Sequence, residues 1–384
     1  MIAGSIYYVP VSTTATSQHL HQIALSLVPG VGGVLIRQLI SYGGSAEAVL
    51  SSPTARLLKI PGVGEITARA IRQPGLLDSA EQVLRRLEKL NARALFYTDP
   101  DYPTRLKTLY DAPALLYQLG NADLNAPRTL ALVGTRQATD YGRRTTEEIV
   151  QAMQPYGVSI ISGLAYGIDV AAHRASLQYG LPTVGVMASG LDIIYPSVHS
   201  RTAQDMQVLG GLLTEHVPGV KPDPRFFPAR NRIIAGLSDA VVIVEAAAKG
   251  GALISAEYAN NYNRDVFAVP GQLSQQFSAG CNKLIRENKA QIYTSPTDLI
   301  EAMNWDQDPA AMAAGKSSAS VPLPLDFTAQ ESQVVALLRQ KPGFHIDELS
   351  WQSQINMGAL ASLLLSLEFR GYVRSLPGKR YEVV

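Results

Sequence analysis

The chain has 384 residues, enough for two or three domains, and its 46% hydrophobic and 17% charged residues exclude a disordered or highly charged protein. Lys and Arg number 33 against 32 Asp and Glu, so the net charge of +1 gives no indication of nucleic acid, and any anion site must come from local clustering. The single cysteine, Cys281, excludes a disulfide framework and a cysteine-rich zinc site. No apolar run reaches the ~18 residues of a membrane helix, and residues 1–18 carry no Lys or Arg for a signal peptide. We therefore expect a soluble, cytoplasmic protein with no membrane partner.

Residues 1–95 are predicted to form a helical domain with glycine-rich turns. Two related stretches, Leu27–Gly32 and Ile60–Gly64, each contain Pro-Gly-Val-Gly and precede a helical pattern. This pair resembles a helix-hairpin-helix or SAM-like domain, in which the glycine turn lets backbone N–H groups approach a DNA phosphate. Arg37, Lys59 and Arg69 would then be auxiliary charges. The alternative is two tight turns in a small helical bundle.

Residues 96–304 alternate short apolar runs with helical stretches. Six runs are predicted to be strands: Thr129–Val133, Val158–Ile161, Thr183–Met187, Leu212–Thr214, Ala240–Val244 and Val266–Val269. This alternation predicts an α/β fold, a Rossmann-like parallel sheet with helices on both faces. Because ligands of such sheets bind beyond the carboxyl ends of the strands, the residues that follow each strand are the candidates for function.

Glycines and small residues follow several of these strands. Gly134-Thr-Arg136 follows the first, Ser162–Asp169 the second, and Lys249-Gly250-Gly251 the fifth. Such segments let backbone amides face an anion such as phosphate. The dinucleotide fingerprint G-x-G-x-x-G is absent after the first strand, which argues against NAD or FAD.

A cluster of cations lies between the fourth and fifth predicted strands. Four basic residues fall within twelve positions and are interleaved with two phenylalanines: Lys221, Arg225, Arg230, Arg232, Phe226 and Phe227. Arginine and aromatic side chains together can grip phosphates and stack on unpaired bases. The alternative is a solvated loop that leads into an amphipathic helix. Arg136, at a strand end on the same predicted face, favours the nucleic-acid interpretation.

The carboxyl-terminal part divides into a linker and a small domain. Residues 305–324 are rich in Ala, Ser and Pro without apolar periodicity, which is typical of a linker. Residues 325–384 carry three helix patterns and two strand-like pieces, which resemble a winged helix. Its third helix, Met357–Phe369, has no Lys or Arg to read base edges, so a protein-interaction or packing module is favoured. Any DNA contact there would come from Arg374, Lys379 and Arg380 on the wing.

Six segments, in this order, resemble the DNA-processing protein A family (DprA, also called Smf). They are VGTR, SGLAYGID, SGLDIIYP, FPARNRIIAGLS, GGALISAEYA and VFAVPG, and the match extends from Leu130 to Tyr293. The resemblance implies a non-enzymatic protein that binds single-stranded DNA in the cytoplasm and dimerises through its Rossmann-like core. It also implies that the protein protects incoming strands and loads the RecA recombinase onto them during natural transformation.

The resemblance assigns roles to individual residues. Arg136 matches the family's strand-end arginine, and the second loop, the basic run and the late glycine loop are matched by Ser162, Gly163, Gly167, Arg230, Asn231, Arg232, Lys249 and Gly250. We add Gly134, Tyr166, Lys221 and Arg225 to this predicted DNA site. Tyr166 departs from the family pattern, because Lys or Arg is usual at this position, and it would exchange a phosphate contact for a stacking platform.

The main alternative is a nucleotide-binding or nucleotide-hydrolysing enzyme. The core is distantly similar to phosphoribohydrolases, whose loop reads P-G-G-x-G-T-x-x-E. Gly250 and Gly251 are in register with Glu257, but Leu253 and Ile254 replace the Gly-Thr pair and would close the phosphate pocket.

Other catalytic interpretations have less support. Asp169 and His173 are four residues apart, yet no Ser or Cys nucleophile is evident nearby, so we expect Asp169 to anchor a helix start and His173 to pack beneath the loop. No set of His, Cys, Asp and Glu has metal-ligand spacing. We therefore expect no catalytic residue, metal or cofactor.

Overall fold

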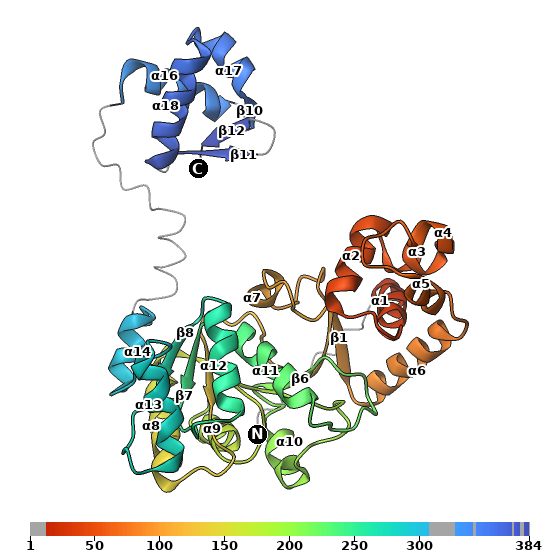
Figure 1. Ribbon diagram of the computed structural model, residues 1–384, viewed down its shortest axis with the longest axis vertical. Helices are drawn as coiled ribbons and strands as arrows, with labels where there is room; N and C mark the ends of the chain where they lie inside the picture. The colour runs from red at the N-terminus through yellow and green to blue at the C-terminus, as the bar shows by residue number, and fades with distance from the viewer. Residues whose placement is uncertain (1–12, 307–326, 341–342, 371, 377–379, 384) are drawn as a thin grey trace, which may run out of the picture. The chain divides into compact units, whose positions relative to one another are not determined.

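The computed structural model describes residues 13–306, 327–340, 343–370, 372–376 and 380–383 (Figure 1). The chain divides into two compact units, residues 1–309 and 310–384. Of the expected linker, residues 305–324, only Trp305 and Asp306 are among the described residues. Trp305 is buried and packs with Leu299, so it belongs to the core of the first unit.

The first unit begins with short helices that surround an apolar core. They are α1 (Thr13–Ser26), α2 (Gly33–Gly43), α3 (Ala46–Ser51), α4 (Thr54–Leu57), α5 (Glu65–Ile71) and α6 (Leu76–Lys89). Helices α2 and α5 are the two predicted after the glycine turns. Their core also contains Phe96 and Tyr117 from the adjacent sheet, so the helices and the sheet edge bury apolar surface together. The boundary expected after Leu95 lies inside the first strand of that sheet.

A nine-stranded sheet forms the centre of the first unit, in the order β1-β2-β6-β5-β4-β3-β7-β8-β9. The strands are β1 (Ala92–Phe96), β2 (Leu115–Gly120), β3 (Thr129–Val133), β4 (Ser159–Ser162), β5 (Thr183–Val186), β6 (Gly211–Thr214), β7 (Ala240–Ile243), β8 (Asp265–Ala268) and β9 (Gln291–Ile292). Neighbours from β6 to β9 run parallel, whereas β2 is antiparallel to both β1 and β6. The six predicted strands are present, each within one residue of its expected bounds.

Helices cover both faces of the parallel strands, as predicted. Leu130 and Leu132 of β3 pack in one apolar cluster, and the alternate residues Ala131 and Val133 pack in the other. The first face is covered by α8 (Asp140–Met153), α9 (Ile168–Gln178) and α14 (Pro296–Ala302); the second by α11 (Phe226–Leu237), α12 (Gly251–Asn261) and α13 (Ala279–Arg286). Burial of both faces explains why these strands read as continuous apolar runs. Short helical segments connect the rest: α7 (Thr104–Lys107), η1 (Gln154–Tyr156), η2 (Ser197–His199), α10 (Ser200–Asp205) and η3 (Gln276–Ser278).

The strand order places a switch point at the carboxyl edge of the sheet. From β3 the chain proceeds through β4, β5 and β6 on one side, then returns to β7 and β8 on the other. Main-chain hydrogen bonds join the loops at this edge: Thr135 N–H donates to the Glu245 carbonyl oxygen at 2.8 Å, and Ala246 N–H to that of Phe277 at 2.7 Å. Gly280 N–H donates to the Ala246 carbonyl oxygen at 2.8 Å. The loops after β3, β7 and β8 are therefore held together at the place where sheets of this kind bind ligands.

The second unit has the helices and wing expected of a winged helix. Helices α16 (Ala329–Gln340), α17 (Ile346–Ser353) and α18 (Met357–Phe369) enclose an apolar core that includes Val334, Leu349 and Leu360. Strands β11 (Val373–Leu376) and β12 (Arg380–Val383) form the wing, and β10 (Phe344–His345), which was not predicted, pairs with β12.

Candidate nucleic-acid interface

A groove of about 770 Å³ lies at the switch point, between the loops after β3 and β7 and the starts of α11 and α12. Six of the predicted site residues line it: Gly134, Arg136, Arg230, Asn231, Lys249 and Gly250. The cations of this lining are Arg136, Arg230 and Lys249, whereas its acidic member, Asp169, is buried. The groove therefore presents positive charge to a ligand.

Three of the predicted glycines are required by close approach. A Cβ at Gly134 would lie 2.4 Å from Cγ1 of Ile168, and one at Gly163 would lie 2.5 Å from Nη2 of Arg230. Gly167 has φ +79°, and a Cβ there would lie 2.1 Å from the Thr135 carbonyl oxygen. Gly134 and Gly167 let the segments after β3 and β4 pack closely together, and Gly163 leaves room for the Arg230 side chain.

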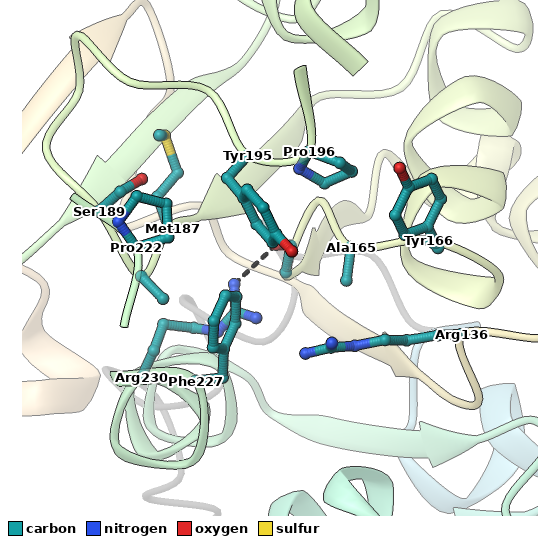
Figure 2. A pocket seen from close by; sticks show the side chains of 12 residues that line it. Arg136, Ala165, Tyr166, Met187, Ser189, Tyr195, Pro196, Pro222, Phe227 and Arg230 are labelled. Carbon is teal, nitrogen blue, oxygen red and sulfur yellow. Dashed lines mark hydrogen bonds between the residues drawn. The ribbon is translucent and has the colours of Figure 1, made fainter. Parts of the chain in front are cut away.

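Arg136 is an exposed cation at one side of the groove. Its guanidinium carbon lies 5.0 Å from the ring centroid of Phe227, a cation–π distance. The ring of Phe227 is in turn 5.7 Å from that of Tyr195. Figure 2 shows the Arg136 side chain directed toward these two rings. A charge and aromatic faces thus occur together, which is the combination that holds a nucleic-acid strand.

Lys249 and Gly250 form the opposite side, on the loop between β7 and α12. Both are exposed. The backbone of Gly250 is extended and nothing lies within 4 Å of the position that a Cβ would take, so this glycine leaves space rather than permitting a strained turn. Helix α12 begins at Gly251, and the unpaired N–H groups of a helix start favour an anion beside Lys249.

Arg230 is buried and binds the protein itself. Its Nη1 donates to the carbonyl oxygens of Gly163, at 2.7 Å, and of Val186, and its Nε donates to Oδ1 of Asn231 at 3.2 Å (Figure 2 marks the bond to Gly163). Burial lowers the pKa of Arg230 to about 10, so the side chain stays charged at neutral pH. Its Nη2 makes no hydrogen bond with the described residues. Arg230 therefore ties the loop after β4 to the end of β5.

Other residues of the predicted site lie outside this lining. Arg225 is exposed, and its Nε lies 2.9 Å from Oδ1 of Asp223. The hydrogen bonds that Arg225 donates from its side chain and its backbone N–H lower the pKa of Asp223 to about 2. Arg232 forms a partly buried ion pair with Glu215. Of the other five, Gly163 and Tyr166 border the recess described next, and Gly167 is described above. Lys221 is exposed beside Pro222, and the hydroxyl of the buried Ser162 donates to the Leu132 carbonyl oxygen at 2.6 Å.

A small recess adjoins the groove, bordered by Tyr166, Tyr195, Phe227, Gly163 and Pro222 among others. Its volume of about 10 Å³ is room for one water molecule. Tyr166 is 48% exposed, and its ring stands edge-on to His199 at 5.1 Å. Phe227 was noted as an aromatic side chain within the basic run, but neither it nor Tyr195 was included in the predicted site. The position of Tyr195, after the third predicted strand in SGLDIIYP, was the signal that could have found it.

Asp169 and His173 have the structural roles that the sequence suggested. Asp169 is buried in the first turn of α9, where burial raises its pKa, and it accepts a long hydrogen bond from Ala165 N–H at 3.4 Å. His173 is fully buried, with Nδ1 2.7 Å from the Thr183 hydroxyl, and burial lowers its pKa to about 3. A histidine that stays neutral and does not line the groove is unsuited to proton transfer there. Among the described residues there is no group of His, Cys, Asp and Glu arranged to hold a metal.

The amino-terminal cations differ in what they face. Arg37 donates from Nη1 to the Leu109 carbonyl oxygen at 3.2 Å and lies 5.1 Å from the Tyr97 ring, so it is directed into the contact with the core. Lys59 and Arg69 are exposed. A DNA contact near these two remains a prediction.

Three cations of the second unit, Arg370, Arg374 and Arg380, are engaged with acidic or main-chain partners, whereas Arg339 of α16 is exposed and forms no ion pair with a described residue. Arg374 pairs with Glu382 at 2.5 Å, and Arg370 pairs with Glu331. Arg380 donates to the Gly343 carbonyl oxygen at 3.1 Å. Lys379, the other predicted wing cation, lies outside the described residues.

Comparison with known families finds matches along most of the chain. The profile described as DNA recombination-mediator protein A matches residues 93–304, the DprA winged helix domain matches residues 316–379, and a SAM-like helix-hairpin-helix tandem matches residues 23–73.

Individual relatives and solved structures agree with these profiles. Protein Smf of Synechocystis sp. is 34% identical over 96% of this chain and 99% of its own length. DNA processing protein DprA of Streptococcus pneumoniae is 43% identical over 53% of this chain and 71% of its own length. The crystal structure of the pneumococcal protein superposes with a TM-score of 0.60 and 32% identity, covering 76% of this chain and 98% of that one. The structure of DNA processing protein A of Helicobacter pylori, studied for its single-stranded DNA binding mode, superposes with a TM-score of 0.52 and 30% identity. The match covers 57% of this chain and 98% of that one.

Proposed function

The chain belongs to the DprA/Smf family of DNA recombination-mediator proteins, and from this premise we propose that it binds single-stranded DNA in the groove at the carboxyl edge of its sheet. The observation that carries the proposal is the presence of exposed cations and aromatic rings in one groove: Arg136 lies beside Phe227 and Tyr195, and Lys249 lies on the opposite side. Cations neutralise phosphates, and the rings offer faces on which unpaired bases stack. A duplex buries its base faces, so we expect the groove to prefer single strands.

The binding test is fluorescence anisotropy with labelled oligo-dT and a matching duplex across a salt series. We expect tighter binding of the single strand and an affinity that falls as salt rises, because phosphate contacts release counterions. Equal affinity for the duplex, or binding that salt does not change, would contradict a single-strand site built on these cations.

We further propose that the protein protects incoming strands and loads RecA onto them during natural transformation, as a cytoplasmic homodimer joined through the core. Similarity to the DprA/Smf relatives supports this role. No described helix combines the length and apolarity needed to cross a membrane. Loading is tested by the rate at which RecA assembles on strands coated with a single-strand-binding protein, with and without this chain. Light scattering tests the dimer.

We propose that binding occurs without chemical turnover. In the place of the Gly-Thr pair of phosphoribohydrolases, Leu253 packs against the core and Ile254 lines the groove. Glu257, which is in register with the catalytic carboxylate of that motif, is exposed and outside the groove lining. Release of ribose phosphate from a nucleoside monophosphate by the purified protein would support the enzyme instead.

A further inference from the structure

Glu245 holds a buried carboxylate at the amino-terminal end of α8, and we propose that it is an internal anion that fills the phosphate position of this fold, so that the chain takes no nucleotide there. The inference goes beyond the proposed DNA site and holds whether or not the groove of Arg136 binds a strand. In a Rossmann-like sheet, the helix after the first parallel strand is the usual place for a nucleotide phosphate. Here that strand is β3, and the helix is α8, which has 14 residues.

The carboxylate of Glu245 is bound as the anion of a ligand would be. Its Oε2 accepts a hydrogen bond from the Thr139 backbone N–H at 2.9 Å, and its Oε1 accepts one from the Thr139 hydroxyl at 2.5 Å. Thr139 is the N-cap of α8, and its hydroxyl oxygen accepts from the Gly142 N–H at 3.2 Å. Two donors and the positive end of the helix therefore compensate the charge of a side chain that is only 4% exposed.

The first turn of α8 leaves room for this carboxylate. A Cβ at Gly142 would lie 2.2 Å from Oε2 of Glu245 and 2.4 Å from its Cδ. Gly142 is part of the helix, where other residues are more favourable than glycine, so the position requires the absence of a side chain and not a special backbone conformation. Glycines of nucleotide-binding loops allow a phosphate the same close approach to a helix start.

Glu245 reaches the start of α8 from a neighbouring strand. It follows β7, which pairs in parallel with β3. Its main chain is fixed on both sides: Thr135 N–H donates to the Glu245 carbonyl oxygen at 2.8 Å, and Ala246 N–H donates to the Phe277 carbonyl oxygen at 2.7 Å. Because the backbone is fixed and both carboxylate oxygens accept hydrogen bonds, the side chain is held at the helix start.

A second groove, of about 730 Å³, gives access to this position. Glu245, Thr139 and Tyr141 line it together with residues of the segment from Pro270 to Ser278. No Lys, Arg or His is among the described residues of this lining, in contrast to the groove of Arg136. A phosphate that entered the second groove would meet the charge of Glu245 without a cation in the lining to offset it. Without the Glu245 side chain, the start of α8 would open into a space within the size range of small-molecule sites, roughly 300–1,000 Å³.

The experiment measures thermal unfolding of the full chain by circular dichroism, in sodium phosphate and in sodium chloride of equal ionic strength. Phosphate should raise the midpoint of Glu245→Ala by about 2 °C or more beyond its effect on the wild type, because a ligand stabilises the state that binds it. The wild type accounts for phosphate bound elsewhere, including the groove of Arg136. Adenosine monophosphate, the nucleotide probe, should act in the same direction.

Two control variants separate the opened position from the loss of a charge. Glu257→Ala removes an exposed carboxylate and leaves the start of α8 filled. Glu245→Gln removes the charge and keeps the volume of the side chain. We expect neither variant to gain stability from phosphate beyond the wild type.

Three results would overturn the inference. Equal gains in Glu245→Ala and both controls would show only the effect of lost negative charge. No gain in Glu245→Ala, including failure to fold in either salt, would show that an external anion cannot take the place of the carboxylate. Gly142→Ala should lower the midpoint of the wild type far more than that of Glu245→Ala, and equal losses would show that the carboxylate does not occupy the helix start. No DNA enters these measurements, so their outcome is distinct from failure of the proposed DNA site.

Discussion

The carboxyl edge of the sheet and the winged-helix unit both have architectures that bind nucleic acids, but the surroundings of their cations differ. At the sheet edge, Arg136 and Lys249 are exposed in a groove, and neither forms an ion pair with a described residue. In the second unit, Arg370 and Arg374 are paired with Glu331 and Glu382. Helix α18, in the position of a recognition helix, contains no Lys or Arg.

This difference teaches that fold alone does not locate a DNA site. A cation already paired with a carboxylate attracts a phosphate only weakly, and a helix without Lys, Arg, Asn or Gln lacks the side chains that usually read base edges. The outward side of α18 is apolar or small instead, with Met357 42% and Leu365 53% exposed, and Trp351 of α17 is 77% exposed. Four measurements test this comparison: two measure the stability of the sheet edge, and two measure which part of the chain binds DNA.

Removal of Arg230 should have the largest effect. Arg230→Ala leaves the Gly163 and Val186 carbonyl oxygens without their charged donor and Asp169 without its nearby cation, so we expect a loss of about 3–5 kcal/mol in unfolding free energy. Urea unfolding followed by far-ultraviolet circular dichroism, which reports the helices of both units, measures it. Arg374→Ala breaks an exposed pair in the second unit and should cost at most about 1 kcal/mol. Similar losses for the two would mean that Arg230 does not hold the edge together.

Loss of the two exposed groove cations should have the next largest effect. The Arg136→Ala/Lys249→Ala double variant should bind oligo-dT about a hundredfold more weakly, roughly 2.8 kcal/mol, with a slope against log salt shallower by about 1.4. Anisotropy titrations at several salt concentrations give both values. The double variant Arg374→Ala/Arg380→Ala, on the wing, should bind like the wild type. If the wing variant lost affinity and the groove variant did not, the DNA site would lie in the second unit.

Acid should destabilise the sheet edge through His173. The pKa of this histidine is about 3 in the folded protein because it is buried, and an unfolded histidine titrates near 6.5. The unfolded state therefore binds one more proton between these values, and stability falls as the pH is lowered. From pH 7 to pH 5 this contribution amounts to about 2 kcal/mol. Urea unfolding at the two pH values should show it in the wild type, and His173→Gln should lack that part of the change.

Deletion of the second unit should have the smallest effect on binding. A chain that ends at Asp306 keeps Trp305 in the core and should bind oligo-dT within tenfold of the full chain, a difference below about 1.4 kcal/mol. A chain that ends at Asn304 loses that tryptophan and should be less stable. If the chain that ends at Asp306 lost more than tenfold in affinity for oligo-dT, the second unit would contribute to the DNA site.

The sequence predicts the part of the fold in which local pattern and burial agree. The strands β3 to β8 are buried on both faces, so their apolar runs are visible, and the helices between them separate one run from the next. Strands β1, β2 and β9 were missed: β1 carries Arg93 and β2 carries Gln118 amid their apolar residues, and β9 has only two residues. Their pairing with neighbours far along the chain is what makes them strands.

The candidate site was predictable in its residue types but not in its partners. The sequence presents Arg225, Arg230 and Arg232 as one cationic run, whereas α11 turns Arg230 into the protein and leaves Arg232 beside Glu215. Glu215 lies on a different element, the segment after β6, and nothing in the run itself indicates the pair. Which cations remain free is a property of the tertiary structure.

The main-chain bonds that join the loops after β3, β7 and β8 have a consequence for how this protein can change in evolution. The bonds from Thr135 to Glu245, from Ala246 to Phe277 and from Gly280 to Ala246 involve only backbone groups, so most side-chain substitutions leave them intact. An inserted or deleted residue in any one of these loops would instead displace the other two and reshape the groove. Variation in chain length among members of the family should therefore be rare at these three loops and accumulate in segments that make no such bonds.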